Sequence, residues 1–198
     1  EIGIYTIPAL LGTKIPVIVS ERNNPYVMPW KRISRICRKL FYPFASGFIF
    51  QTEEAASFFS EKIRMKSVIL PNPLDLKSIP TRSTKRKKEI VAVGRLVPQK
   101  NFHLLIRAFK EFVKYYPEYK LKIYGDGPLK RELIDFTHEL LLMDCVIFMG
   151  RSSSVLELIK DAGMFVLCSD YEGMPNVLIE AMSMGMPVIS TDCPTGGP

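Results

Sequence analysis

Short apolar runs and amphipathic stretches alternate along the whole chain. The apolar runs are rich in valine and isoleucine and nearly continuous, which is typical of strands that are covered on both faces of a parallel sheet. The stretches between them repeat apolar residues at helical spacing, as in NFHLLIRAFKEFVKYY. This alternation predicts an α/β protein in which helices connect parallel strands.

The first part of the chain contains three of these apolar runs. They predict strands at 15–20, 47–51 and 67–70. A helix is expected at about 30–42, and a second one from Thr52 onward. Thr52 can cap that second helix, and Glu53 and Glu54 are favourable in its first turn. Residues 1–75 are therefore expected to form part of one domain.

A proline-rich and basic stretch follows. The segment LPNPLDLKSIP opposes regular structure because proline lacks a backbone donor and fixes its own backbone angle. Residues 76–88 are interpreted as a linker, and the basic run Lys85–Lys88 within it as solvated rather than as an arm that binds nucleic acid. Residues 89–198 then form a second domain.

The second domain shows the clearer pattern of strands and helices. Its apolar runs predict strands at 89–94, 121–125, 145–150, 163–169 and 187–191. Right-handed crossovers between these strands would produce a Rossmann-like parallel sheet. Ligands of such sheets bind at the carboxyl ends of the strands. The loops after Val93, Tyr124, Met149, Cys168 and Thr191 are therefore the places to look for a site.

The loop after the first of these strands reads GRLVPQKN. Gly94 lets the backbone approach a ligand, and Arg95 and Lys100 place two cations just before a helix N-terminus. That combination predicts an anion site, although two solvated surface charges would give the same pattern. The loop lacks the GxGxxG fingerprint, which argues against a dinucleotide-binding enzyme.

The loop after the fourth strand carries two glutamates in YEGMPNVLIEAMSMGMP. Glu172 precedes a predicted helix that Asn176 can cap, and Glu180 lies about one turn inside that helix. The first amides of the helix would be available to an anion. A buried Glu180 would need a partner such as a ligand hydroxyl pair, whereas a solvated Glu180 would not. On composition alone the two interpretations are equally supported.

Charge and cysteine content limit the other function classes. The formal net charge is +7, and no acidic residue occurs from Arg22 to Thr52. In that stretch, Trp30–Tyr42 combines a predicted apolar face with five basic residues, which fits either an interfacial helix on anionic lipid or a core-packed helix with a basic solvated face. The four cysteines and two histidines lack the spacing of metal ligands. No metal site or resident cofactor is expected.

The motifs GRLVPQKN, IYGDGP and SDYEGMPNVLIEAMSMGMPVISTDCPTGGP together resemble the nucleotide-binding domain of retaining GT-B glycosyltransferases. The earlier segments PVIVSERNNPY, FIFQTEEAASFF and VILPNPLD resemble the later half of the N-terminal domain of that family. The resemblance implies a GT-B type α/β fold. It also implies that the chain is partial, because the family's first strands and closing helices have no counterpart in it.

The resemblance assigns roles to individual residues. Arg95 and Lys100 would bind the donor diphosphate, and Glu172 would lie near the donor sugar, so these three are the expected catalytic residues. Glu180 would hold the ribose hydroxyls of the donor. The remaining positions expected to contact the donor are Gly94, Gly150, Arg151, Gly173, Met174, Pro175, Asn176 and Val177.

The resemblance also implies an activity and its partners. The expected reaction is metal-independent, retaining transfer of a sugar from a nucleotide-diphosphate sugar, in first place a UDP-sugar, to a glycan or lipid-linked acceptor. A non-catalytic nucleotide-sugar-binding module is the alternative, and a nucleic-acid binder ranks last because no interleaved aromatic platform is present. A cytoplasmic location is expected, with the basic helix resting on the inner face of a membrane.

Overall fold

The computed structural model describes residues 2–81 and 85–193, which divide into two compact units. The first unit contains the residues up to Pro73, together with Tyr171–Met174 and Cys193. The second unit contains Leu74–Asp170 and Pro175–Asp192. Each unit is built around a parallel sheet, so the predicted α/β class is confirmed.

The sheet of the first unit has three parallel strands in chain order, β1 (Ile18–Glu21), β2 (Gly47–Phe50) and β3 (Ser67–Ile69). All three lie where the apolar runs predicted them. The helices are α1 (Gly3–Leu10), α2 (Arg32–Phe41), α3 (Glu53–Ser57) and α4 (Glu61–Arg64), with a 3₁₀ helix, η1 (Tyr42–Phe44). The rings of Tyr42, Phe48, Phe50 and Phe59 form an aromatic core between them.

The helix predicted after Thr52 starts as expected but is divided in two. The Thr52 hydroxyl accepts a hydrogen bond from the Ala55 amide at 3.1 Å, so the predicted cap is confirmed. The helix is interrupted at residues 58–60. The interruption lets Phe59 enter the aromatic core while the preceding Phe58 lies beneath the Arg38 guanidinium, 4.6 Å from its ring centroid. A continuous helix would point two successive phenylalanines in directions about 100° apart.

The sheet of the second unit has five parallel strands in the order β6-β5-β4-β7-β8. Their bounds are β4 (Lys87–Val93), β5 (Lys120–Tyr124), β6 (Val146–Gly150), β7 (Ala162–Leu167) and β8 (Val188–Ser190). The predicted Rossmann-like sheet is confirmed. Strand β4 begins at Lys87, two residues before its predicted start, and Lys88 pairs with Glu118 at 2.8 Å.

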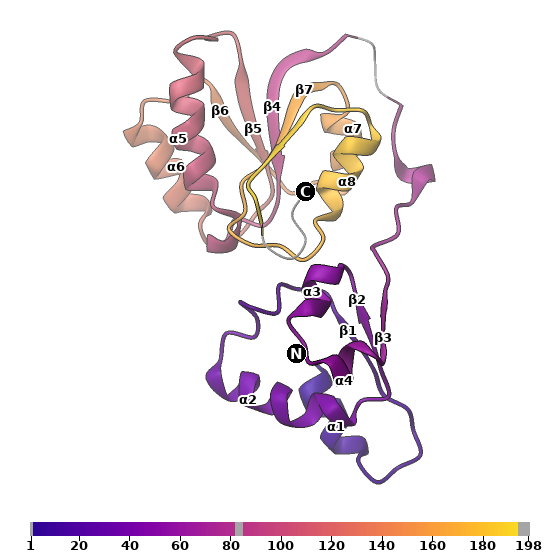
Figure 1. Ribbon diagram of the computed structural model, residues 1–198. Helices are drawn as coiled ribbons and strands as arrows, with labels where there is room; N and C mark the ends of the chain where they lie inside the picture. Colours follow the sequence, from indigo (N-terminus) through magenta and orange to yellow (C-terminus); the bar gives the residue numbers. More distant parts are fainter. Residues whose placement is uncertain (1, 82–84, 194–198) are drawn as a thin grey trace. The chain divides into compact units, whose positions relative to one another are not determined.

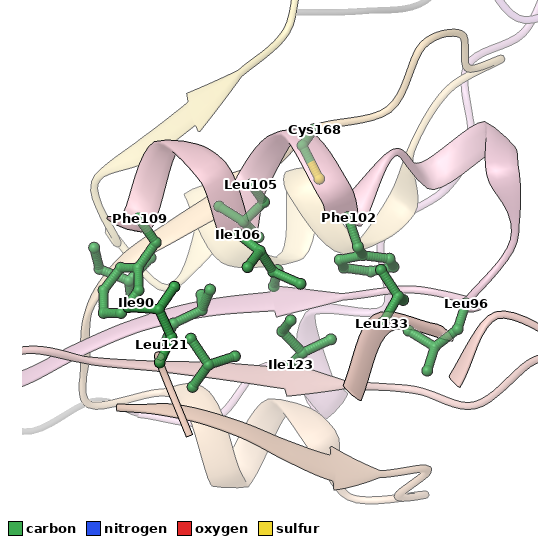
Figure 2. Packing of buried hydrophobic residues seen from close by; sticks show 13 residues of the cluster. Ile90, Leu96, Phe102, Leu105, Ile106, Phe109, Leu121, Ile123, Leu133 and Cys168 are labelled. Carbon is green, nitrogen blue, oxygen red and sulfur yellow. The ribbon is translucent and has the colours of Figure 1, made fainter. Parts of the chain in front are cut away.

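Helices cover both faces of this sheet (Figure 1). The connections contain α5 (Phe102–Val113), α6 (Lys130–Glu139), α7 (Val155–Ile159) and α8 (Asn176–Ser183), with 3₁₀ helices η2 (Leu76–Ser78) and η3 (Pro98–Lys100). Ile90 and Ala92 of the central strand β4 pack with residues of α5 and α6 (Figure 2). Val91, between them, packs with residues of α7 and α8. Strand β4 is therefore buried on both faces.

The loops that leave β4, β5 and β6 meet backbone to backbone. The Gly94 amide donates to the Tyr124 carbonyl at 2.9 Å, and the Gly125 amide donates to the Gly150 carbonyl at 2.8 Å. Gly125 has φ of +146°, and a methyl group on it would overlap the carbonyl oxygen of Gly94. Glycine is required here because the neighbouring chain occupies the space of a side chain.

We predict that Gly125→Ala destabilises the second unit by at least about 2 kcal/mol, because it adds both backbone strain and a steric clash. Gly47→Ala is the matched control, since its added methyl would meet nothing closer than 3.5 Å. Urea unfolding of the two variants and the parent measures the difference. Equal losses of stability in both variants would contradict the assigned backbone contact.

Candidate functional site

The first βα loop of the second unit places a lysine against a glycine at the start of a long helix. The side chain of Lys100 lies beside Gly94, where an added Cβ would be 3.4 Å from Lys100 Cδ. Asn101 follows in the left-handed conformation with φ of 43°, and its side chain accepts from the Leu104 amide to cap α5. The loop therefore holds Lys100 beside Gly94 and next to the N-terminus of α5.

Arg95 and Arg151 line one cavity of about 410 Å³ at the carboxyl edge of the sheet. Gly94 contributes to the same wall, whereas Gly150 lies next to it and bonds the Gly125 amide. Val93, Tyr124 and Val155 also line this cavity. A cavity lined by two arginines suits a ligand that carries anionic groups.

Tyr124 is a lining residue that the motif analysis did not single out. It is the last residue of β5 and is almost fully buried. Burial raises the pKa of its hydroxyl, so the group is neutral near pH 7. The rule that ligands bind at the carboxyl ends of parallel strands pointed to this position, since Tyr124 precedes one of the five expected loops.

A hydrogen-bonded tie joins the Lys100 loop to the loop after β7. Asn101 Nδ2 donates to Asp170 Oδ1 at 2.6 Å, and the Asp170 amide donates to the Gln99 carbonyl at 2.9 Å. The Cys168 thiol donates to the Lys100 carbonyl at 3.0 Å. Sequence analysis missed Asn101 and Asp170, although an Asn directly before an apolar helical repeat is a recognisable capping pattern.

The start of α8 differs by one residue from the prediction. Pro175, rather than Asn176, occupies the N-cap position, and its carbonyl accepts from the Leu178 amide at 3.0 Å. Asn176 is the first helical residue and is exposed, so the prediction that it caps the helix is wrong. Pro175 has an extended backbone and its carbonyl already accepts the first hydrogen bond of the helix, so Asn176 lies inside the first turn and not before it. Val177 remains in the first turn as expected.

Glu180 lies partly buried on the second turn of α8. Its side-chain carboxylate has no hydrogen-bond or ion-pair partner within residues 2–81 and 85–193, and burial raises the pKa of this carboxyl. A half-buried carboxylate of this kind favours a ligand that brings hydrogen-bond donors, such as a pair of hydroxyls. The structure thus supports the buried interpretation of Glu180 over the fully solvated one.

Glu172, Gly173 and Met174 belong to the first compact unit rather than the second. Glu172 is 7% exposed. The Met174 carbonyl accepts from Asn72 Nδ2 at 3.2 Å, and a side chain on Gly173 would overlap the Arg22 carbonyl. The structure therefore assigns the two glutamates to different units.

The described residues contain no group of three or more histidine, cysteine, aspartate or glutamate side chains that could hold a metal ion. Among the helices of this same part of the chain, none is long and apolar enough to cross a bilayer.

Residues 76–198 match the family model described as glycosyl transferases group 1. An uncharacterized glycosyltransferase of Methanocaldococcus jannaschii is 33% identical over 99% of this chain and 54% of its own length. A 4-alpha-N-acetylgalactosaminyltransferase of Campylobacter jejuni, whose name specifies a diphospho-undecaprenol substrate, is 30% identical over 94% of this chain and 54% of its own length. The chain thus spans about half the length of these curated relatives.

Solved structures support the fold. HepE of Anabaena, crystallised with UDP and glucose, superposes with a TM-score of 0.84 at 19% identity, covering 96% of this chain and 56% of that protein. TarM of S. aureus superposes with a TM-score of 0.80 at 21% identity, covering 98% of this chain and 41% of that protein. At these levels of identity the likeness concerns the fold.

We predict that Glu180→Gln raises the melting temperature of the ligand-free protein at pH 7. The folded state disfavours the charged form of Glu180, so its contribution is favourable below the pKa of the unfolded chain and is lost as pH rises through the higher folded pKa. The gain should shrink as pH is lowered toward 4. Thermal melts of the two proteins at both pH values measure this, and an equal or larger gain at pH 4 would contradict it.

Proposed function

Because the chain belongs to the glycosyl transferases group 1 family, we propose that the protein transfers a sugar from a nucleotide-diphosphate sugar with retention of configuration and without a metal ion. The observation that carries the proposal is the arrangement of cations at the carboxyl edge of the second sheet. There, Arg95 and Arg151 line one cavity, and Lys100 lies beside Gly94 at the N-terminus of α5. A UDP-sugar is the donor we propose first.

The charges of this edge suit the leaving group of the reaction. Breaking the bond between the sugar and the diphosphate leaves growing negative charge on the phosphate oxygens. Arg95, Lys100 and the first amides of α5 would stabilise that charge, each donor supplying on the order of 3 kcal/mol to the barrier. Since fixed cations serve this purpose, the mechanism requires no Mg²⁺.

The remaining positions fit the other parts of the donor. Glu180 would accept hydrogen bonds from the ribose hydroxyls, and Arg151 and the backbone at Gly150 would contact the base. The Pro175–Val177 turn would face the sugar and phosphates. We propose that Glu172 acts near the donor sugar, where it orients the sugar as the bond breaks.

The relatives support the proposed acceptor and location. The name of the Campylobacter relative specifies a lipid diphosphate, which supports a glycan or lipid-linked acceptor. We propose that residues 1–75 belong to the acceptor-side domain and 89–198 to the nucleotide-sugar domain, joined by 76–88. A cytoplasmic protein resting on an anionic membrane surface through Trp30–Tyr42, without nucleic acid as a partner, completes the proposal.

We predict that the whole protein binds UDP in calorimetry and transfers sugar in the presence of EDTA, and that Lys100→Ala lowers kcat by roughly a hundredfold or more. Lys114→Ala is the control, because that exposed lysine lies at the surface and pairs with Glu111. UDP binding without turnover by the parent protein would favour the non-catalytic module instead. Binding of a short oligonucleotide in place of UDP would reject both.

The two glutamates should separate kinetically. Glu180→Ala removes acceptors for hydroxyl groups, so we predict a donor KM or UDP Kd raised about tenfold to a hundredfold with little change in kcat. Glu172→Gln should lower kcat with a smaller effect on UDP binding. Steady-state kinetics measure both, with thermal melts to confirm that the variants fold, and the reverse pattern would mean that the roles are exchanged.

A further inference from the structure

Helix α2 presents its apolar stripe to solvent. Ile33, Ile36 and Leu40 recur at helical spacing and are between 58% and 68% exposed. The opposite side of the same helix buries Ser34 and Arg38. Cys37 and Phe41, the other apolar residues in the later half of the helix, are partly buried against the core of the first unit. The exposed stripe is therefore separate from the core contacts of the helix.

Basic residues flank this stripe along one side. On a helical projection, Arg32, Arg35 and Lys39 fall between the apolar stripe and the buried face. All three are exposed, and the surrounding sequence from Arg22 to Thr52 contains no acidic residue. An apolar stripe with a one-sided basic border is the pattern of a helix that lies in the interface of an anionic bilayer.

A cavity of about 540 Å³ opens beside the basic border. Arg35 and Lys39 of α2 line it on one side, and Phe58, Phe59 and Ile63 supply an apolar wall. Its lining also includes the buried Arg38 but no acidic residue. Cations at the rim of an apolar hollow match a lipid phosphate attached to hydrocarbon.

The arginines of this cavity are held in place by backbone carbonyls. Arg38 donates to the carbonyls of Met28 at 2.6 Å and Pro25 at 2.9 Å. Arg35 donates to the carbonyls of Pro29 at 2.7 Å and Val27 at 2.8 Å. These contacts fix the positive charge beside the cavity, so little side-chain freedom is lost when a phosphate binds.

We infer that α2 and the adjoining cavity form a docking surface for an anionic phospholipid bilayer, in which Ile33, Ile36 and Leu40 enter the interface and a lipid phosphate sits between Arg35 and Lys39. This inference rests on the proposed membrane partner and deepens it by naming the residues. The occupant follows from charge complementarity, because the surface combines apolar and exclusively basic groups. A protein partner with a mixed surface would leave those charges unmatched.

The test is cosedimentation of the whole protein with vesicles of phosphatidylcholine alone or mixed with phosphatidylglycerol. We expect binding to the mixed vesicles, weaker binding in high salt and little binding to phosphatidylcholine alone. Ile33→Ser with Ile36→Ser, and separately Arg32→Ala with Lys39→Ala, should each weaken binding roughly tenfold or more. The second pair avoids the arginines that hold backbone carbonyls.

Matched controls come from the second unit. Leu104→Ser with Leu158→Ser removes two exposed helical leucines, and Lys114→Ala with Arg131→Ala removes two exposed cations. Both control pairs should bind vesicles like the parent. UDP binding should be the same in every variant, which separates failure of this inference from failure of the proposed function.

Several outcomes would overturn the inference. Equal binding to neutral vesicles, or equal loss of binding in the test and control pairs, would exclude a docking surface for anionic lipid on α2. Binding of inorganic phosphate or glycerol phosphate without any vesicle binding would mean that the cavity takes a soluble phosphate. The parent protein could instead be a dimer in light scattering and fail to bind vesicles. If only the variant with Ile33→Ser and Ile36→Ser were then monomeric, a second copy of the chain would cover the stripe.

Discussion

The middle of strand β4, Ile90–Ala92, is buried on both faces, and the arrangement of the second unit depends on that burial. Ile90 and Ala92 contact one layer of helices, and Val91 contacts the other. This part of the strand has no exposed face on which to place a charge without a large desolvation cost. Charged groups therefore lie before and after it, and Arg95 and Lys100 follow its carboxyl end. The same burial that stabilises the sheet decides where a ligand can bind.

Close backbone contact at the sheet edge has a second effect. Because Gly125 carries no side chain, its backbone can approach the carbonyl of Gly94, and the loops after three neighbouring strands join through backbone hydrogen bonds. Arg95 and Arg151, which follow two of these strands, line the cavity beside these bonds.

Much of this could be predicted from the sequence, for identifiable reasons. The strands are strongly apolar in sequence because they lie in the apolar interior of each unit. All eight strands of the described residues therefore fall at predicted places. Helix boundaries were less accurate. Asn176 is a good capping residue, yet the extended Pro175 preceding it closes the turn first. The outward apolar stripe of α2 could not be predicted, because helical periodicity shows that a face exists but not which face meets the core. The tie between Asn101 and Asp170 joins residues far apart in the chain, which a local pattern does not reveal.

The hydrogen bonds of Asn101 order the loop that carries Lys100. Asn101 caps α5 with its side-chain oxygen and holds Asp170 with its side-chain nitrogen, while its backbone adopts an angle that most residues avoid. The Lys100 loop is thus ordered before any ligand arrives. Binding an anion there immobilises little more than the end of the lysine side chain, so most of the conformational entropy has already been lost when the chain folds.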